Sequence, residues 1–139
     1  MGAITRLQDM GIEPFLLSST LLGVISQRLV RSLCPQCKTE LSLSDEELVT
    51  YGIAKTDKIY QIKGCSSCLK SGYKGRSGIY EMIEIDDALA SMIHDKESQS
   101  RIESYCHGKS HNLRDDGIRK VVRGETSLDE VLRVTRDNI

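Results

Sequence analysis

The chain has 139 residues, 39% of them apolar and 28% charged, which is ordinary for a folded soluble protein and limits it to one domain or two small ones. The net charge of -1 gives no electrostatic reason to expect a nucleic acid as partner. The most apolar stretch, residues 15–30, is interrupted by polar side chains and falls short of the roughly 20 apolar residues of a membrane span. No secretory signal pattern is visible. We therefore expect no transmembrane segment, and cysteines that lie in a reducing compartment.

Three elements are predicted in the first 33 residues. Residues 3–10 are expected to form a short helix, which Gly11 ends because glycine suits a left-handed C-cap. Pro14 fits the first turn of a second helix, expected over residues 14–26. The apolar side chains of this helix leave only a narrow polar strip, which predicts that it is largely buried. An alternating pattern over residues 27–33 predicts a strand that leads into the first cysteines.

The middle of the chain combines a helix with two strands. Ser44 and Glu47 have the spacing of a capping box and predict a small helix, which Gly52 ends. Alternation predicts one strand over residues 58–63 and another over residues 78–85. Between these strands we expect a tight loop, because three glycines follow one another closely: Gly72, Gly75 and Gly78.

The chain after Asp86 is expected to be helical to its end. Ser127 and Glu130 have capping-box spacing at the start of the last helix, and Gly124 supplies the turn before it. The four predicted helices lie near residues 87–94, 98–107, 112–123 and 127–137. The predicted fold class is therefore α+β: a small four-cysteine module with short strands, followed by an all-helical C-terminal subdomain.

Four cysteines carry the strongest chemical signal in the sequence: Cys34, Cys37, Cys65 and Cys68. They form two Cys-x2-Cys pairs that are separated by 27 residues. A gap of two residues lets both sulfurs of a pair reach one metal from a tight turn, and two such turns complete a tetrahedron of thiolates. We expect the metal to be zinc. Because four protein ligands leave no position for water or substrate, the site should be structural and not catalytic.

Three other interpretations of these cysteines stay open. Iron in a rubredoxin-like site uses similar pairs, but such modules are usually rich in buried aromatic residues, and this chain has five Tyr, one Phe and no Trp. A redox dithiol needs only one pair, at a helix N-terminus that lowers a thiol pKa. Disulfides suit a secreted domain. The fifth cysteine, Cys106, lacks a second cysteine at ligand spacing and is expected to be a small apolar residue on an amphipathic helix.

Candidates for catalysis are weak. The three histidines are scattered, and His107 and His111 would share a helix face only if a helix continued through Gly108. Asp115 and Asp116 fit the acidic residues that a helix dipole favours in a first turn. The sequence contains no phosphate-binding loop, dinucleotide turn or nucleophile elbow. We therefore predict no catalytic and no nucleotide-binding residues in this chain.

Three segments carry a resemblance to a known family. The run GAITRLQDMGIEPFLLSSTLLGVISQRLVRSLCPQC resembles the end of the motor domain in type II secretion ATPases and their type IV pilus assembly relatives. The run GCSSCLKSGYKGRSGIYEMIEIDDAL is similar to the tetracysteine segment of that family and its exit. The run LRDDGIRKVVRGETSLDEVLRVT resembles the C-terminal helices of the family. Within these runs, RDDG and GIYEMIEIDD look more like the secretion branch than the pilus branch.

The resemblance implies a division of the chain into three parts. Residues 1–30 would be the end of a RecA-like motor domain, residues 31–78 the tetracysteine zinc-binding module, and residues 79–139 the helical C-terminal subdomain. It also implies a longer parent protein whose phosphate-binding loop and Mg2+ site lie upstream. ATP and Mg2+ would bind only there, and this chain alone would be inactive. Only the four cysteines are carried over as ligands, and Gln27 and Arg28 are given no role.

The parent that the resemblance implies is a hexameric ATP hydrolase at the cytoplasmic face of the inner membrane, where it drives assembly of a pseudopilus. This chain would supply a structural zinc site and a docking surface for inner-membrane platform proteins. Two alternatives stay open: the same region of a type IV pilus assembly ATPase, and a free-standing zinc-ribbon adaptor. The apolar helix predicted over residues 14–26 argues against the adaptor, which has no reason to carry such a helix ahead of its zinc site.

Overall fold

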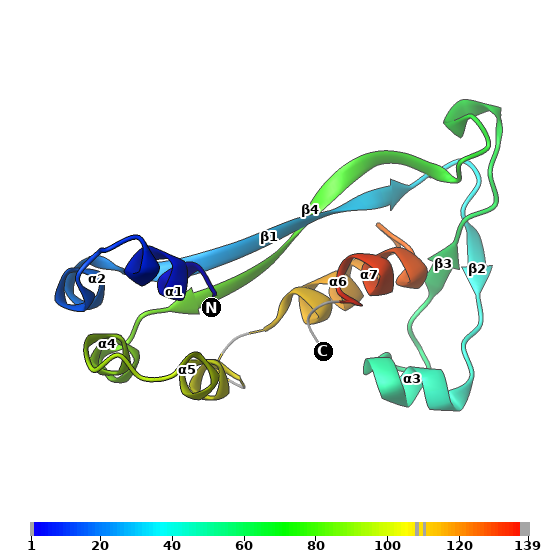
Figure 1. Cartoon of the computed structure of the whole chain (residues 1–139). Helices are drawn as coiled ribbons and strands as arrows, with labels where there is room; N and C mark the ends of the chain where they lie inside the picture. Colours follow the sequence, from blue (N-terminus) through cyan, green and yellow to red (C-terminus); the bar gives the residue numbers. More distant parts are fainter. Residues whose placement is uncertain (1, 108, 110, 137–139) are drawn as a thin grey trace. The chain divides into compact units, whose positions relative to one another are not determined.

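The computed structural model describes residues 2–107, 109 and 111–136 (Figure 1). Within these residues the chain forms seven α-helices, one 3-10 turn and four strands, so the predicted α+β class is confirmed. The chain divides into two compact units, each made of two separate segments. Unit 1 contains the residues up to Ser26 together with Glu81–His111, and unit 2 contains Gln27–Tyr80 together with the residues from Asn112 onward.

Unit 1 is built from four helices: α1 (Gly2–Asp9), α2 (Pro14–Thr20), α4 (Asp87–His94) and α5 (Gln99–Cys106). The aspartate at the start of α4, Asp86, caps it by accepting a hydrogen bond from the Leu89 amide at 2.9 Å. The same carboxylate forms a 2.7 Å ion pair with Lys109. The core of the unit consists of seven buried side chains: Ile4, Leu17, Ile83, Leu89, Ile93, Ile102 and Cys106.

The helix predicted over residues 14–26 is wrong in its second half. It ends at Thr20, and the strand β1 (Gly23–Leu33) begins three residues later. The β-branched residues Val24 and Ile25 favour extended backbone, and pairing with a second long strand makes that preference decisive. The predicted burial holds for Leu17, which is 4% exposed, but not for the segment as a whole, because several of its apolar side chains are exposed: Phe15, Leu16, Leu22 and Ile25.

The second long strand, β4 (Tyr73–Glu84), pairs with β1. The Ile85 amide donates to the Leu22 carbonyl, and the Cys34 amide donates to the Gly72 carbonyl, so the two strands run antiparallel. The tight loop predicted over residues 72–78 is therefore wrong, because the strand passes through both later glycines. Glycine weakens the interior of a strand, so the sequence pattern around Gly75 and Gly78 did not indicate one. Pairing with β1 nevertheless keeps both residues within β4.

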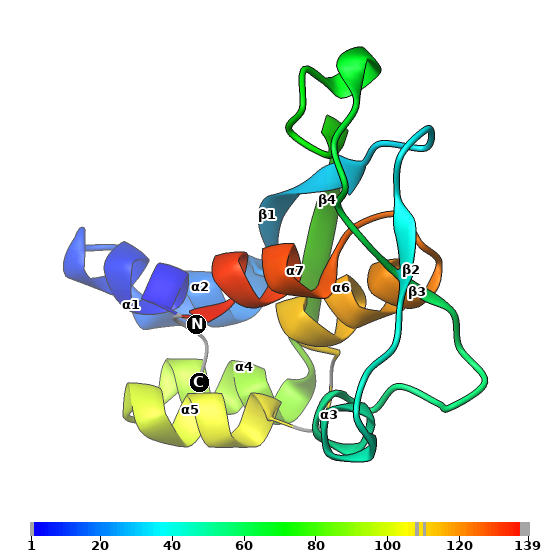
Figure 2. The same cartoon turned by 90° about the vertical axis from the view of Figure 1, so that its right-hand side faces the viewer.

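Unit 2 packs two short strands and three helices around the start of β4 and the end of β1 (Figure 2). Strands β2 (Thr39–Leu41) and β3 (Ile59–Gln61) pair antiparallel, and the helices are α3 (Asp45–Tyr51), α6 (Leu113–Val122) and α7 (Leu128–Val134). The capping box predicted for α3 is confirmed: the Ser44 hydroxyl accepts from the Glu47 amide, and the Glu47 carboxylate accepts from the Ser44 amide.

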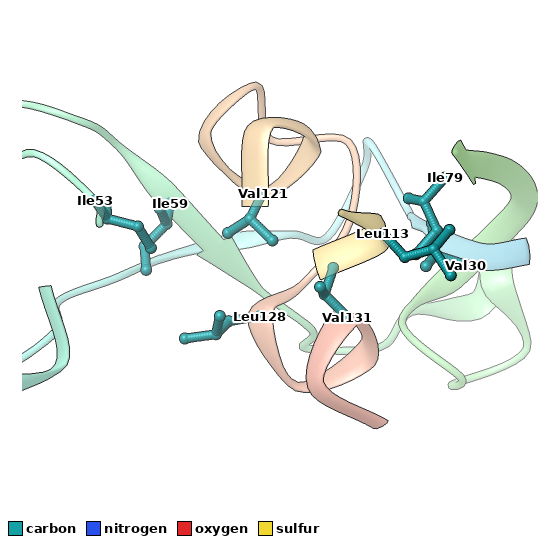
Figure 3. Close-up of a cluster of buried hydrophobic side chains, with 8 residues drawn as sticks. All are labelled: Val30, Ile53, Ile59, Ile79, Leu113, Val121, Leu128 and Val131. Carbon is teal, nitrogen blue, oxygen red and sulfur yellow. The ribbon is translucent and has the colours of Figure 1, made fainter. Parts of the chain in front are cut away.

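The core of unit 2 brings together side chains that are distant in sequence (Figure 3). Helices α6 and α7 pack closely at Gly117, where an added Cβ would lie 2.5 Å from a Val131 methyl group. The helices predicted after Asp86 are present within the described residues, although residue 137, the predicted end of the last one, lies outside them. The buried members of this core are Val30, Ile53, Ile59, Ile79, Leu113, Val121, Leu128 and Val131.

Candidate metal centre

The first cysteine pair lies in a turn at the end of β1. Strand β1 ends at Leu33, and the chain turns so that the amides of Cys37 and Lys38 both donate to the Cys34 carbonyl, at 3.3 and 3.0 Å. Such a turn needs only the two residues between the cysteines. It places both sulfurs of the pair on the same side of the backbone, as a metal-binding knuckle requires.

The second pair lies in the 3-10 turn η1 (Ser66–Cys68). The Lys70 amide donates to the Cys65 carbonyl at 2.8 Å, which closes the turn. The chain that leaves this turn passes close to Ile62. Gly72 has a φ of +77°, and an added Cβ there would lie 2.5 Å from the Ile62 side chain. Gly72 is therefore required both for its left-handed backbone and for this close approach. Its carbonyl accepts from the Cys34 amide at 2.9 Å, which joins the two cysteine turns.

The four sulfur atoms converge on one point. All of them lie within 4.8 Å of one another. The Sγ–Sγ distances are 3.9 Å for Cys34 and Cys65, 3.8 Å for Cys37 and Cys68, and 3.7 Å for Cys65 and Cys68. A tetrahedron with zinc–sulfur bonds of about 2.3 Å has sulfur–sulfur edges of about 3.8 Å. The donor set thus fits a tetrahedral metal ion. The distances far exceed the roughly 2.05 Å of a disulfide, and all five cysteines are free.

Burial and backbone amides give the thiols of this site different pKa values. The Cys68 sulfur accepts hydrogen bonds from the Cys65 amide at 3.2 Å and the Gly72 amide at 3.3 Å, and these bonds lower the pKa of Cys68 to about 6. Burial raises the pKa of the Cys37 thiol to about 11. A metal ion that binds here must therefore displace protons, so its affinity falls at low pH.

Other residues that the sequence singled out lie away from this cluster. Cys106 is buried in the apolar core of unit 1, as predicted, and burial raises the pKa of its thiol. Helix α5 ends at Cys106, so His107 and His111 do not share a described helix, and Gly108 lies outside the described residues. Asp115 belongs to a capping box with Asn112 in the first turn of α6, as predicted for a first-turn acid.

An ion-pair network around one buried carboxylate, that of Glu130, was missed by the sequence pattern. The Glu130 side chain is 0% exposed and accepts from Arg31 at 2.7 Å and from Arg133 at 2.8 Å. Ser127 caps α7 as predicted, but Glu130 does not complete the capping box because its carboxylate turns to the arginines. The sequence offered no clear signal for this pair, because Glu130 also has the spacing of a capping box with Ser127.

This network connects to the cysteine turns through several contacts. The Arg31 guanidinium lies 4.0 Å from the centre of the Tyr73 ring, and the Tyr73 hydroxyl is 2.7 Å from the Ser127 hydroxyl. The Leu33 amide donates to the Glu125 carbonyl at 2.8 Å. Lys38, directly after the first cysteine turn, donates to the Gly124 carbonyl at 2.8 Å. The turn between α6 and α7 is thus attached to the chain on both sides of Cys34.

Comparison with known proteins places the chain in a family. The family model described as "Type II/IV secretion system protein" matches residues 1–133, so the chain belongs to this family. It is 48% identical to "Type II secretion system protein E" of Pseudomonas aeruginosa, covering 99% of this chain and 28% of that protein. It is 46% identical to "Type II secretion system ATPase E" of Vibrio cholerae, with the same two coverages.

The chain therefore spans little more than a quarter of the length of the curated relatives it matches. A relative described as "Putative type II secretion system protein E", from Escherichia coli, gives the same picture, with 43% identity over 96% of this chain and 27% of that protein. Among the described residues, no helix is long and apolar enough to cross a membrane.

Proposed function

We propose that this chain is the C-terminal, metal-binding part of the cytoplasmic ATPase that powers type II protein secretion by driving pseudopilus assembly. The observation that carries the proposal is the match of nearly the whole chain, at 46% identity, to a relative named as a secretion ATPase. The matched relatives are type II secretion system proteins, which favours the secretion branch over the pilus branch. Similarity over 99% of the chain also disfavours a free-standing zinc-ribbon adaptor.

The four cysteines are proposed to hold one structural zinc ion. The geometry that supports this is the convergence of four sulfurs with edges near those of a zinc tetrathiolate. When bound, zinc supplies a cross-link between the end of β1 and the start of β4, with an apparent binding free energy of about 10–16 kcal/mol in small modules. Four cysteine ligands leave no open coordination position, so the role is structural and not catalytic.

The protein residues around the site extend this cross-link to the C-terminal helices. Lys38 donates a hydrogen bond to the Gly124 carbonyl, and the Leu33 amide donates one to the Glu125 carbonyl. The position of the α6–α7 turn therefore depends on that of the first cysteine pair. Glu130 fixes α7 to Arg31 on β1. The proposed consequence is a rigid surface, formed by the cysteine turns and helices α6 and α7, on which platform proteins of the inner membrane dock.

In the proposed parent, residues 1–30 end the RecA-like motor domain, residues 31–78 form the zinc module, and residues 79–139 form the helical C-terminal subdomain. ATP and Mg2+ bind upstream of this chain in that arrangement. The parent acts as a hexamer at the cytoplasmic face of the inner membrane and is attached there peripherally. Exposed apolar side chains in α2, at the start of β1 and between the two support this division, since a motor domain would cover them: Phe15, Leu16, Leu22 and Ile25.

The test is metal analysis combined with secretion by the parent protein. We expect close to one zinc per chain, and a red, iron-containing protein would reverse the metal assignment. Cys34→Ser should lower the zinc content and abolish secretion by the parent. Cys106→Ser is the matched control, because that cysteine lies in an apolar core, and it should leave both unchanged. Equal effects of the two substitutions would contradict the assignment of ligands, and normal secretion by a zinc-free parent would contradict the proposed role.

A further inference from the structure

The N-terminal end of helix α7 is attached to strand β1 by several hydrogen bonds. The Glu130 carboxylate accepts from the Arg31 guanidinium at 2.7 Å and from the Arg31 amide at 3.1 Å, and the Thr126 hydroxyl donates to the Arg31 carbonyl at 2.8 Å. Figures 1 and 2 both show α7 beside β1. Contacts at one end of a helix fix the position of that end, but they leave the helix able to pivot about it.

The C-terminal end of α7 has a separate attachment to the same strand. The half-buried Arg28 side chain on β1 donates a hydrogen bond to the carbonyl of Val134, the last residue of α7. Carbonyls in the last turn of a helix lack partners within the helix and carry its partial negative charge, so a guanidinium is a strong donor to them. Glu130 and Val134 are about 6 Å apart along the helix axis. Two attachments at this separation fix the direction of α7 relative to β1.

Capping of the helix end does not by itself explain the contact of Arg28. Arg114, on α6, donates to the hydroxyl and to the carbonyl of Thr135, both at 3.2 Å, so this end of α7 already has a cationic donor. The Thr135 side chain is fully buried. Arg114 and α7 both belong to the C-terminal helices, whereas Arg28 comes from a strand 106 residues before Val134. Arg28 therefore adds a long-range connection to an end that is capped without it.

We propose that Arg28 is a positioning residue that attaches the C-terminal helices directly to the motor domain, so that α7 moves with β1. The inference rests on the proposed function, in which residues 1–30 end the motor domain and residues 79–139 form the C-terminal subdomain. In that division, the bond from Arg28 to Val134 joins the two parts without passing through the zinc module between them.

The contacts of the zinc module with the C-terminal helices have a different origin. Leu33 and Lys38 lie on either side of Cys34, and each donates to a carbonyl of the α6–α7 turn at 2.8 Å. These two bonds depend on the conformation of the first cysteine turn. Arg28 lies earlier on β1, where pairing with β4 holds the backbone. Its attachment should therefore keep the last turn of α7 in place when the metal is absent.

The first experiment measures amide hydrogen exchange of this chain with zinc bound and after chelation. The reporter is the Thr135 amide, which donates to the Val131 carbonyl in the last turn of α7. Arg28→Gln should accelerate its exchange about tenfold, because the helix end loses a bond to a charged donor. The acceleration should be the same with and without zinc. An unchanged exchange rate, or one that changes only when zinc is bound, would overturn the proposal.

The exchange of α6 amides serves as the folding control. It should be unchanged in Arg28→Gln, since the apolar core of unit 2 does not include this side chain. Arg28→Lys keeps the positive charge but loses the guanidinium fork, so it should accelerate exchange at Thr135 less than Arg28→Gln does. If Arg28→Gln unfolds unit 2, Arg28→Lys replaces it in every comparison.

The second experiment measures ATP hydrolysis and secretion by the full-length parent. Arg28→Gln should leave ATP hydrolysis unchanged and lower secretion about tenfold, because movement of the motor domain reaches the C-terminal helices less directly. Arg114→Gln is the matched control. It removes an arginine from the same helix end, and should loosen that end, but it leaves the attachment to β1 intact and should secrete nearly as the unchanged parent does.

The outcomes separate this inference from the proposed function. An unchanged parent that hydrolyses no ATP would contradict the proposed function, and the exchange experiment would still decide whether Arg28 holds α7. Normal secretion by Arg28→Gln, an equal loss of secretion in Arg114→Gln, or loss of ATP hydrolysis in Arg28→Gln would each overturn only the role proposed for Arg28.

Discussion

The Arg31 guanidinium lies 2.7 Å from the Glu130 carboxylate, although 99 residues separate the two in the chain. Arg31 is three residues before Cys34, and Glu130 is fully buried on the first turn of α7. The pair therefore fixes the C-terminal helix to the strand that carries the first cysteine turn. Because a buried charge is costly without its partner, this contact makes the two segments depend on each other.

The first prediction concerns the pH dependence of stability. Burial raises the pKa of Glu130, but hydrogen bonds from Arg133 and Arg31 outweigh it and hold the pKa at about 2, below the usual value of about 4.3. A lowered carboxyl pKa gives stability that is present above the unfolded pKa and is lost as the pH falls toward the folded pKa. We expect the pair to contribute on the order of 3 kcal/mol at neutral pH, lost between about pH 4.3 and pH 2.

Glu130→Gln tests this prediction by urea unfolding at several pH values. The variant should lose about 2–3 kcal/mol of unfolding free energy at pH 7. Below about pH 4.3, its unfolding free energy should depend less on pH than that of the unchanged chain. Some pH dependence should remain, because Lys109 holds the pKa of Asp86 at about 2 and Asp86 titrates in the same range. Glu40→Gln, at an exposed pair with Lys58, is the control and should change little. If the unfolding free energy of Glu130→Gln fell with acid as steeply as that of the unchanged chain, Glu130 would not be the source of this pH dependence.

The second prediction concerns metal removal. Residues 34–38 and 65–72 have few apolar contacts of their own, so chelation should unfold both cysteine turns. Amide hydrogen exchange should then accelerate at Cys34 and Lys70, whose bonds close the turns. The amides of α4 should keep their protection, because Leu89 and Ile93 lie in the separate core of unit 1. Global loss of protection on chelation would show that the two units do not have independent stability.

The third prediction concerns self-association. Phe15 and Leu22 are 54% and 86% exposed, and burying each such side chain is worth roughly 1.5–3 kcal/mol. We expect concentration-dependent association of the chain, measured by light scattering. Phe15→Ser with Leu22→Ser should weaken it without loss of stability. Leu17→Ser, at a buried position, should instead destabilise unit 1. A chain that stays monomeric at high concentration would contradict this expectation.

The fourth prediction is that the chain neither binds ATP appreciably nor hydrolyses it. Phosphoryl transfer needs a cradle of backbone amides, a positioned lysine and a Mg2+ site, and the sequence contains no such motif. The measurement is phosphate release by the zinc-loaded chain, with a full-length relative as positive control. Turnover comparable to that of the full-length protein would contradict the proposal that ATP and Mg2+ bind upstream of this chain.

The sequence by itself determined the features that depend on neighbouring residues. The Cys-x2-Cys pairs bring two sulfurs together through one tight turn, and the Ser44–Glu47 capping box forms within a single helical turn. Helices after Asp86 follow from apolar periodicity and caps over short windows. The family resemblance had the same basis, since it depended on contiguous motifs, and the family comparison confirmed it.

The tertiary structure alone decided the features that depend on distant partners. Pairing with β4 converted residues 23–26 from the expected helix to strand, and it extended β4 through Gly75 and Gly78. The Glu130 carboxylate could accept a hydrogen bond at the start of its own helix or pair with a distant arginine. Because α7 packs beside β1, it pairs with Arg31. Local preferences differ by about 1 kcal/mol or less, so a strand pairing or a buried ion pair outweighs them.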